Sequence, residues 1–411
     1  MKSSLILLQS LWLSLFQKPR ATSRPLNSSG EKNQTNASIR RLDYLDSIRG
    51  IASLAVIGWH YFEAYNMPLG CTWWITKPLV TLFYDGGAAV CIFFVLSGFV
   101  LALKPVRLYG SHYSLRGELA PYIITRASRI LLPYWAILLL SSFVGHHFYS
   151  MPPTIPQANP WLLGLWQGPG AQNLQAQLMF SQTSYLPQGW TLAIEWTCSM
   201  ILPFMLLVAN NGVLYLALFV FLYLQWFGLN IIWIISFALG VAIAMRLEYI
   251  QELFAPMSLK KKYMILLIGL LILNINTIAR YLGMASPALK GYLMSNAAII
   301  TTMGASLVIV CVLVSRRIQG MLRHKILLFY GRVSYSMYLL HILVLVSITP
   351  KILNGLNAHG VRGVTVANIC GYVCTVAVTT LLAAISYAVV ERPAIRIGRW
   401  AVDWCRSLAT R

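Results

Sequence analysis

The residue pair best suited to chemistry lies in one apolar stretch near the start of the chain. In LDYLDSIRGIASLAVIGWHYFEAY, residues 42–65, Arg49 and His60 are eleven positions apart. Eleven residues make about three helical turns, so on a helix the two side chains share a face roughly 16 Å apart. An ionisable group deep in a membrane helix is unfavourable and is therefore a functional candidate by default. His60 is the candidate base, and a hydrogen bond to a neighbouring helix is the structural alternative.

Two further apolar stretches carry polar side chains at comparable depth. In QGWTLAIEWTCSMILPF, Glu195 lies between Trp190 and Trp196 and needs a partner, for which His60 is the candidate. In FYGRVSYSMYLLHILV, Tyr338 and His341 continue a polar stripe on one helix face, which predicts that they point toward the bundle interior.

Several candidates lie nearer the ends of the apolar segments. Arg126 and Arg129 are three residues apart and share a helix face, an arrangement that suits phosphate oxygens but also anchors a helix at the cytoplasmic surface. Asp46 is a supporting polar residue before Arg49. Ser97 precedes Gly98 and favours close helix packing. Glu391 lies at the end of the last span among arginines, where a structural ion pair is expected.

The composition identifies the class of protein. Of 411 residues, 58% are hydrophobic and 10% are charged, against a usual charged share of about a quarter. Such a chain is predicted to be an all-α, multi-pass membrane protein. The net charge of +21 is spread between apolar segments, which argues against nucleic-acid binding. The seven cysteines form no CxxC pair and no zinc-like cluster, so no metal site is expected.

About ten segments are long enough, or nearly so, to span a membrane. They lie at about 47–65, 80–103, 130–148, 188–209, 212–227, 229–246, 263–282, 293–314, 326–348 and 368–390.

The basic residues predict how these spans are oriented. With ten spans, 27 of the 32 Lys and Arg residues fall on the side of the N-terminal tail. The positive-inside rule then places both termini in the cytoplasm. Asn27, Asn33 and Asn36 are glycosylation sequons, which would favour a lumenal tail. A signal-like role for the short apolar run 5–16 would reverse the orientation, and the charge distribution outweighs it.

The polar motifs, taken together and in order, resemble one family. LDSIRGIASLAVIGWHYF, IFFVLSGFVLA, ITRASRILLPYW, QGWTLAIEW, YGRVSYSMYLLH and VVERPAIRIGR are similar to segments of the membrane-bound acyltransferase-3 family, which includes O-antigen and exopolysaccharide acetylases. The resemblance predicts a polar tail with a short apolar segment at 1–41, a transmembrane acyltransferase domain at 42–400 and a cytoplasmic C-terminal tail at 401–411. This chain has Thr191-Leu192-Ala193 where the family often has Ser-Leu-Ser.

The resemblance implies an enzyme that moves an acyl group, usually acetyl, from acyl-coenzyme A to a hydroxyl. It implies that His60 and Arg49 form the family's Arg-x10-His signature and that Arg126 and Arg129 form its Arg-x-x-Arg pair, with Glu195 as its carboxylate. Arginines at the inner surface would hold the phosphates of coenzyme A, and His60 would act as general base with Glu195 orienting it. An acyl-histidine intermediate is the alternative route. Acyl-coenzyme A is a co-substrate, and no bound cofactor is expected.

The sequence indicates less about the acceptor substrate than about the acyl donor. The loop 149–187 contains no Lys or Arg and is rich in Gln, Pro and Trp, which favours a small or lipophilic hydroxy compound, such as a secondary metabolite, over a glycan. A secondary transporter is the competing class, but it should show internal repeats, and none is found. If the source is eukaryotic, the endoplasmic reticulum or another endomembrane is the expected location.

Overall fold

The computed structural model describes residues 42–65, 85–109, 118–148, 159–166, 174–209, 218, 220, 231–282, 287–359 and 364–409. Within these ranges the regular structure is helical, without a strand, as predicted for an all-α protein. The helices, in chain order, are α3 (Asp43–Ala64), α5 (Gly86–Tyr109), α6 (Leu119–Phe148), α7 (Pro160–Trp166), α8 (Leu174–Leu178), α9 (Gly189–Ala209), α11 (Ile232–Met245), α12 (Leu247–Phe254), α13 (Leu259–Leu273), α14 (Ile275–Leu282), α15 (Pro287–Val314), α16 (Arg316–Leu322), α17 (Lys325–Ser347), α18 (Thr349–Ala358), α19 (Val364–Ser386), the π-helical turn η2 (Tyr387–Glu391) and α20 (Arg392–Ala409).

Six helical stretches in the described chain are long and apolar enough to cross a membrane, and a bent pair adds a seventh. The six comprise α5, α6, α9, α15, α17 and the continuous α19–η2–α20 helix, and the bent pair is α11 and α12, which meet at 72°. The predicted number of about ten is therefore not confirmed.

The differences from the predicted spans have local causes. Helix α3 occupies the first predicted span, but Arg49, His60 and Glu63 lower its hydropathy. The predicted span 263–282 is broken at Asn274 into α13 and α14. The predicted span 212–227 lies outside the described residues apart from two positions.

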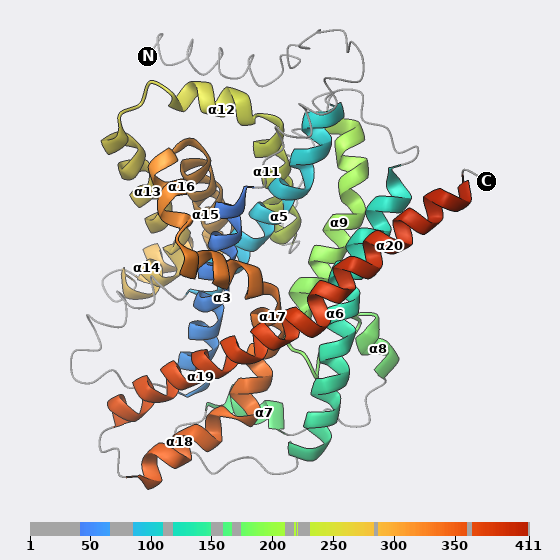
Figure 1. Cartoon of the computed structure of the whole chain (residues 1–411). Coiled ribbons are helices and arrows are strands. Elements are labelled where there is room, and N and C mark those ends of the chain that lie inside the picture. The colour runs from blue at the N-terminus through green and yellow to red at the C-terminus, as the bar shows by residue number, and fades with distance from the viewer. Residues whose placement is uncertain are drawn as a thin grey trace.

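Helix α17 occupies the centre of the bundle. Nearly every side chain from Val333 to Val346 is buried. Helices α3, α6 and α19 pack around it, and α5 packs against α3 on the far side (Figure 1). Because α3 is enclosed in this way, Ser47 and Ser53 are buried and Arg49 and His60 are partly buried, whereas Glu63 near its end is exposed.

Small residues allow a second close helix contact, between α5 and α11. A Cβ atom placed on Gly98 would meet the carbonyl oxygen of Phe237, and one on Gly240 would meet the backbone of Val95. These glycines let the two backbones approach, as small residues commonly do between membrane helices. The close packing predicted from Ser97-Gly98 is confirmed.

The last helix continues past the predicted end of the final span. The backbone passes through η2 and on into α20 as far as Ala409, so residues 401–409 are helical. Pro393 has no N–H to donate to the carbonyl four residues earlier, which explains the local change of hydrogen bonding at η2.

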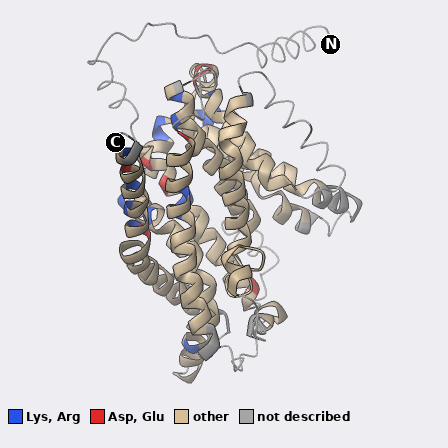
Figure 2. Cartoon of the chain, turned by 90° about the vertical axis from the view of Figure 1, so that its right-hand side faces the viewer, with Lys and Arg blue, Asp and Glu red and all other residues tan. Residues whose placement is uncertain are grey.

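Charged side chains are unevenly distributed along the bundle. Lys and Arg gather toward one end of the helices (Figure 2). Helix α12 and the C-terminal end of α20 lie toward this end, whereas α18 lies at the other end (Figure 1).

Candidate active site

Two glycines bring α3 and α17 into close contact and thereby position the candidate base. A Cβ atom on Gly50 would meet the backbone of Tyr330 and Gly331, and one on Gly331 would meet the backbone of Asp46. Ten residues farther along each helix lie His60 and His341. Their rings are 5.0 Å apart between centroids, so the two helices run parallel from the glycine contact to the histidine contact.

The hydrogen bonds around the histidine pair define where each proton lies. His341 Nδ1 is 2.7 Å from the carbonyl oxygen of Tyr338, so this nitrogen donates and carries the proton. In neutral His341, Nε2 then has a lone pair, and it lies 3.3 Å from Nδ1 of His60. His60 Nδ1 also lies 2.9 Å from the carbonyl oxygen of Val56. Because both neighbours are acceptors, His60 Nδ1 carries the proton and Nε2 holds the free lone pair that a base requires.

An aromatic side chain holds the face of the His60 ring. Trp161 of α7 stacks on it with a centroid distance of 5.7 Å and an interplanar angle of 29°. Helix α7 belongs to the loop 149–187 that the sequence assigns to the side opposite the basic residues. The ring is thus fixed at Nδ1 and on one face.

A cavity of about 780 Å³ lies between α3, α5, α6, α9, α17 and α20. Eight cationic side chains line it against three carboxylates. The cations are Arg49, Lys104, Arg126, Arg129, Arg332, Arg392, Arg396 and Arg399. The carboxylates are Asp46, Glu195 and Glu391. This excess of positive charge suits a polyanionic ligand.

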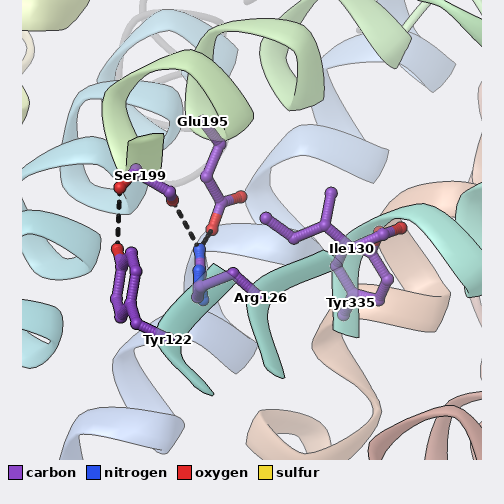
Figure 3. Close-up of polar contacts among 6 residues, drawn as sticks. All are labelled: Tyr122, Arg126, Ile130, Glu195, Ser199 and Tyr335. Carbon is purple, nitrogen blue, oxygen red and sulfur yellow. Dashed lines mark hydrogen bonds and ion pairs between the residues drawn. The ribbon is translucent and has the colours of Figure 1, made fainter. Parts of the chain in front are cut away.

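The arginines that line the cavity differ in whether their side chains already have partners among the described residues. Arg126 Nη2 lies 3.0 Å from Glu195 Oε1 and donates to Ser199 Oγ at 2.9 Å, and Figure 3 shows its guanidinium between these two side chains. Arg49 pairs with Asp46 at 3.8 Å. Arg129 is exposed and, within the described chain, has no ion pair or hydrogen bond through its side chain. It is the arginine of the predicted pair that is free to bind an anion.

Glu195 does not contact His60. It is engaged by Arg126, and the partner that the structure gives His60 is His341. Hydropathy predicts how deep a side chain lies but not which neighbour it faces. The expected Glu195–His60 pairing is therefore replaced by a histidine–histidine contact.

Tyr338 lies between the cavity and the histidine pair. Its hydroxyl is 2.6 Å from Thr191 Oγ1, and its ring is 5.6 Å from that of His341. Tyr338 lines the cavity, whereas the two histidines do not. Tyr338 is thus the inner wall of the cavity on the histidine side.

The remaining predicted residues also lie at the cavity. Ser97 lines it and is buried. Glu391 is buried and accepts a hydrogen bond from Ser336 Oγ at 3.0 Å, with Arg129 and Arg49 acting on it electrostatically. In the described part of the chain Glu391 has no ion pair within 4.0 Å, so the expected structural pair is a longer-range interaction.

Five cavity cations were missed by the sequence reasoning. Arg392, Arg396 and Arg399 recur at i, i+4 and i+7, which puts them on one face of α20. That spacing in the sequence could have identified these three arginines as one cationic helix face. Lys104 and Arg332 lie on α5 and α17 and carried no comparable signal, because neither belongs to a run of basic residues that repeats along one helix face.

Comparisons with known proteins agree with the interpretation of the sequence motifs. One curated relative, the O-acetyltransferase PaAT-1 of Phomopsis amygdali, is 24% identical over 163 residues, which is 37% of this chain and 32% of the relative. The match thus spans about a third of the length of that relative. No solved structure matches the chain. A sequence model of the family described as "Acyltransferase domain" matches residues 42–388. The match covers most of the chain and confirms the resemblance drawn from its motifs, and the protein belongs to the acyltransferase-3 family.

Proposed function

We propose that this protein is a membrane O-acyltransferase that moves an acyl group from acyl-coenzyme A to a hydroxyl, with His60 as general base. The observation that carries the proposal is the cavity of about 780 Å³ with its eight cationic side chains, together with Tyr338, which lines the cavity and contacts the ring of His341. Coenzyme A is a polyanion with a long neutral arm. Its phosphates suit the cationic side chains of the cavity.

Donor binding is assigned to the arginines that line this cavity. Arg129 and the three arginines of α20 are exposed and offer planar donors that suit phosphate oxygens. Arg126 acts differently, because its guanidinium is already shared with Glu195. Glu195 is then a residue that holds Arg126 in place. Arg49 completes the cationic wall on α3.

The chemical step is acyl transfer. His60 Nε2 takes the proton of the acceptor hydroxyl as the oxygen attacks the thioester carbonyl carbon. The carbon–sulfur bond then breaks, and the leaving thiolate recovers the proton from the His60 imidazolium. The products are an ester and free coenzyme A thiol, so the proton count balances. General-base catalysis of this kind contributes about 10²–10⁴-fold in rate. Attack by His60 itself, through an acyl-histidine, is the alternative route.

The acyl group is assigned as acetyl, and the acceptor as a small or lipophilic hydroxy compound. The name of the matched relative, an O-acetyltransferase, supports both an acetyl group and an oxygen acceptor. Trp161 packs on His60, is partly exposed and does not line the cavity, so an aromatic surface lies beside the base. A glycan acceptor is the alternative within the same reaction class.

A transfer assay with labelled donor tests this proposal. Purified protein in nanodiscs receives [¹⁴C]acetyl-coenzyme A and extracts of lipids, hydroxylated secondary metabolites or glycans, and the label is followed into organic and aqueous products. We expect label in the organic fraction and release of an equal amount of free thiol. Label in glycan alone would reassign the acceptor. Uptake of intact label into sealed vesicles without thiol release would instead make the protein a transporter.

A further inference from the structure

His341 occupies the place beside His60 that a carboxylate occupies in hydrolytic triads. In such a triad the third residue accepts the Nδ1–H of the catalytic histidine, fixes its tautomer and stabilises the imidazolium. In this protein Glu195 is held by Arg126 at 3.0 Å, and the atom facing Nδ1 of His60 is Nε2 of His341 at 3.3 Å.

The surroundings of His341 leave its Nε2 available to accept a hydrogen bond from His60. The side chain is fully buried, and the carbonyl of Tyr338 takes its Nδ1 proton. The second ring nitrogen, Nε2, is an acceptor in this tautomer, and it lies 3.3 Å from Nδ1 of His60 on α3.

We infer that His341 is a positioning residue for His60 in the proposed acyl transfer, an inference that rests on the proposed function. Its Nε2 lone pair accepts the Nδ1–H of His60, together with the carbonyl of Val56 at 2.9 Å. This keeps Nε2 of His60 deprotonated and directed at the acceptor hydroxyl. When His60 gains the substrate proton, the same lone pair stabilises the resulting imidazolium. The carboxylate of a hydrolytic triad stabilises its histidine in the same way.

Two amide substitutions separate this role from packing. His341→Asn places its amide about where imidazole Nδ1 lies, so it keeps the bond to Tyr338 but offers nothing to His60. His341→Gln places an amide oxygen about where Nε2 lies and can accept from His60. His341→Phe retains the ring volume and removes both functions. All three are first compared with wild type by thermal unfolding and size-exclusion chromatography.

The Gln and Asn variants should differ in kcat. We expect His341→Gln to stay within about threefold of wild type, and His341→Asn and His341→Phe to fall about 10- to 100-fold, the value of a hydrogen bond to a charged group. The KM for acetyl-coenzyme A should not change, because the cavity cations are untouched. An Asn variant as active as the Gln variant, or a loss confined to KM, would overturn the inference.

A chemical labelling experiment tests the contact between His341 and His60 without requiring enzyme turnover. Diethyl pyrocarbonate carbethoxylates the imidazole nitrogen that holds a free lone pair, and peptide mass spectrometry measures the rate at His60. His60 should react fastest in wild type and His341→Gln, and several-fold more slowly in His341→Asn. Equal rates in all variants would overturn the positioning role. A wild type that labels as expected but transfers no acyl group would contradict the proposed function alone.

Discussion

At the scale of single residues, the arginines of the cavity differ in what they already bind. Arg126 is committed to Glu195 and Ser199, whereas Arg129, one helical turn farther on, has no such partner among the described residues. A guanidinium without a partner in a basic cavity can bind an incoming phosphate without first breaking an ion pair. The two arginines of one motif therefore differ in their contacts, and we expect substitutions at them to have different effects.

Arg129→Gln should raise the KM for acetyl-coenzyme A while leaving the acceptor KM and the thermal stability unchanged. One charge-assisted hydrogen bond is worth about 1.5–3 kcal/mol, which corresponds to a KM increase of roughly 10- to 100-fold. Steady-state kinetics with each substrate varied in turn measures it. Arg317→Gln, an exposed arginine of α16 outside the cavity, is the control. An unchanged donor KM would reduce Arg129 to an anchor at the membrane surface.

Arg126→Gln should act mainly on stability. It leaves Glu195 without its cation in a partly buried site. Removing one partner of such a pair lowers the stability of the fold more than removing both. The double variant Arg126→Gln with Glu195→Gln should therefore unfold at a higher temperature than Arg126→Gln alone. A double-mutant cycle by thermal unfolding measures the coupling. Additive losses would show that the 3.0 Å contact contributes nothing to the fold.

The types of the site residues could be predicted from sequence, but their pairing could not. Arg49, Arg126, Arg129 and Glu195 all line one cavity, although the sequence placed the arginines near the ends of apolar segments and Glu195 at the depth of His60. His341 was predicted as a supporting side chain, whereas its contact with His60 depends on which face of α17 meets α3. Hydropathy carries no information on that choice. Only the shared ten-residue spacing from a glycine to a histidine hinted at it.

At the scale of elements, the parallel contact of α3 and α17 determines the site. Gly50 and Gly331 bring the two backbones together, and about 15 Å farther along, at 1.5 Å per residue, the histidines meet. Ser47 near the start of α3 donates to the carbonyl of Leu322, and Tyr65 at its end donates to that of Leu345. The first bond ties α3 to the end of α16, and the second ties it to α17 beyond the histidine contact.

Gly331→Ala should separate these helices and lower both stability and activity. The added Cβ would collide with the backbone of Asp46, which cannot move aside as a flexible side chain can. Overpacking of this kind costs about 1–3 kcal/mol. Thermal unfolding and the transfer rate measure the effects. Gly355→Ala in α18 meets no neighbour within 4 Å and is the matched control, expected to be neutral or slightly stabilising. Equal behaviour of the two variants would show that the close contact is unimportant.

The number of spans was harder to predict than their existence. Helices α9, α15 and α17 lie close to the predicted segments, because each is one long apolar run. The runs containing Arg246 and Asn274 are instead divided into separate helices. Composition does not reveal a bend at one polar residue, because the hydropathy of the whole window stays high.

At the scale of the whole molecule, the uneven charge supports a single orientation in the membrane. Lys and Arg gather toward one end of the bundle (Figure 2), and the cavity cations of α6 and α20 belong to the same asymmetry. The positive-inside rule then predicts that the cavity opens toward the cytoplasm, where the proposed donor, acyl-coenzyme A, is found. The sequons at Asn27, Asn33 and Asn36 lie outside the described residues, and the same rule predicts a cytoplasmic location for them.

Asn27, Asn33 and Asn36 should therefore carry no glycan when the protein is made in a glycosylating host. Glycosylation requires lumenal exposure, and the charge distribution predicts a cytoplasmic location for this tail. Treatment with an endoglycosidase followed by gel electrophoresis measures it, with the triple Asn→Gln variant as control. A shift that the enzyme removes and the variant lacks would reverse the orientation and place Arg49 on the wrong side for the donor.

The most direct test of the account is the initial rate of label transfer from [¹⁴C]acetyl-coenzyme A by wild type, His60→Ala and His359→Ala. His359 is exposed at the end of α18 and lies outside the cavity, so its variant should match wild type. His60→Ala should keep its donor binding and thermal stability but lose at least about a hundredfold in rate, because it removes the Nε2 lone pair that is proposed to take the proton of the acceptor hydroxyl. A His60→Ala variant that retains more than about a tenth of the wild-type rate would contradict the general-base role, whose expected contribution is about 10²–10⁴-fold.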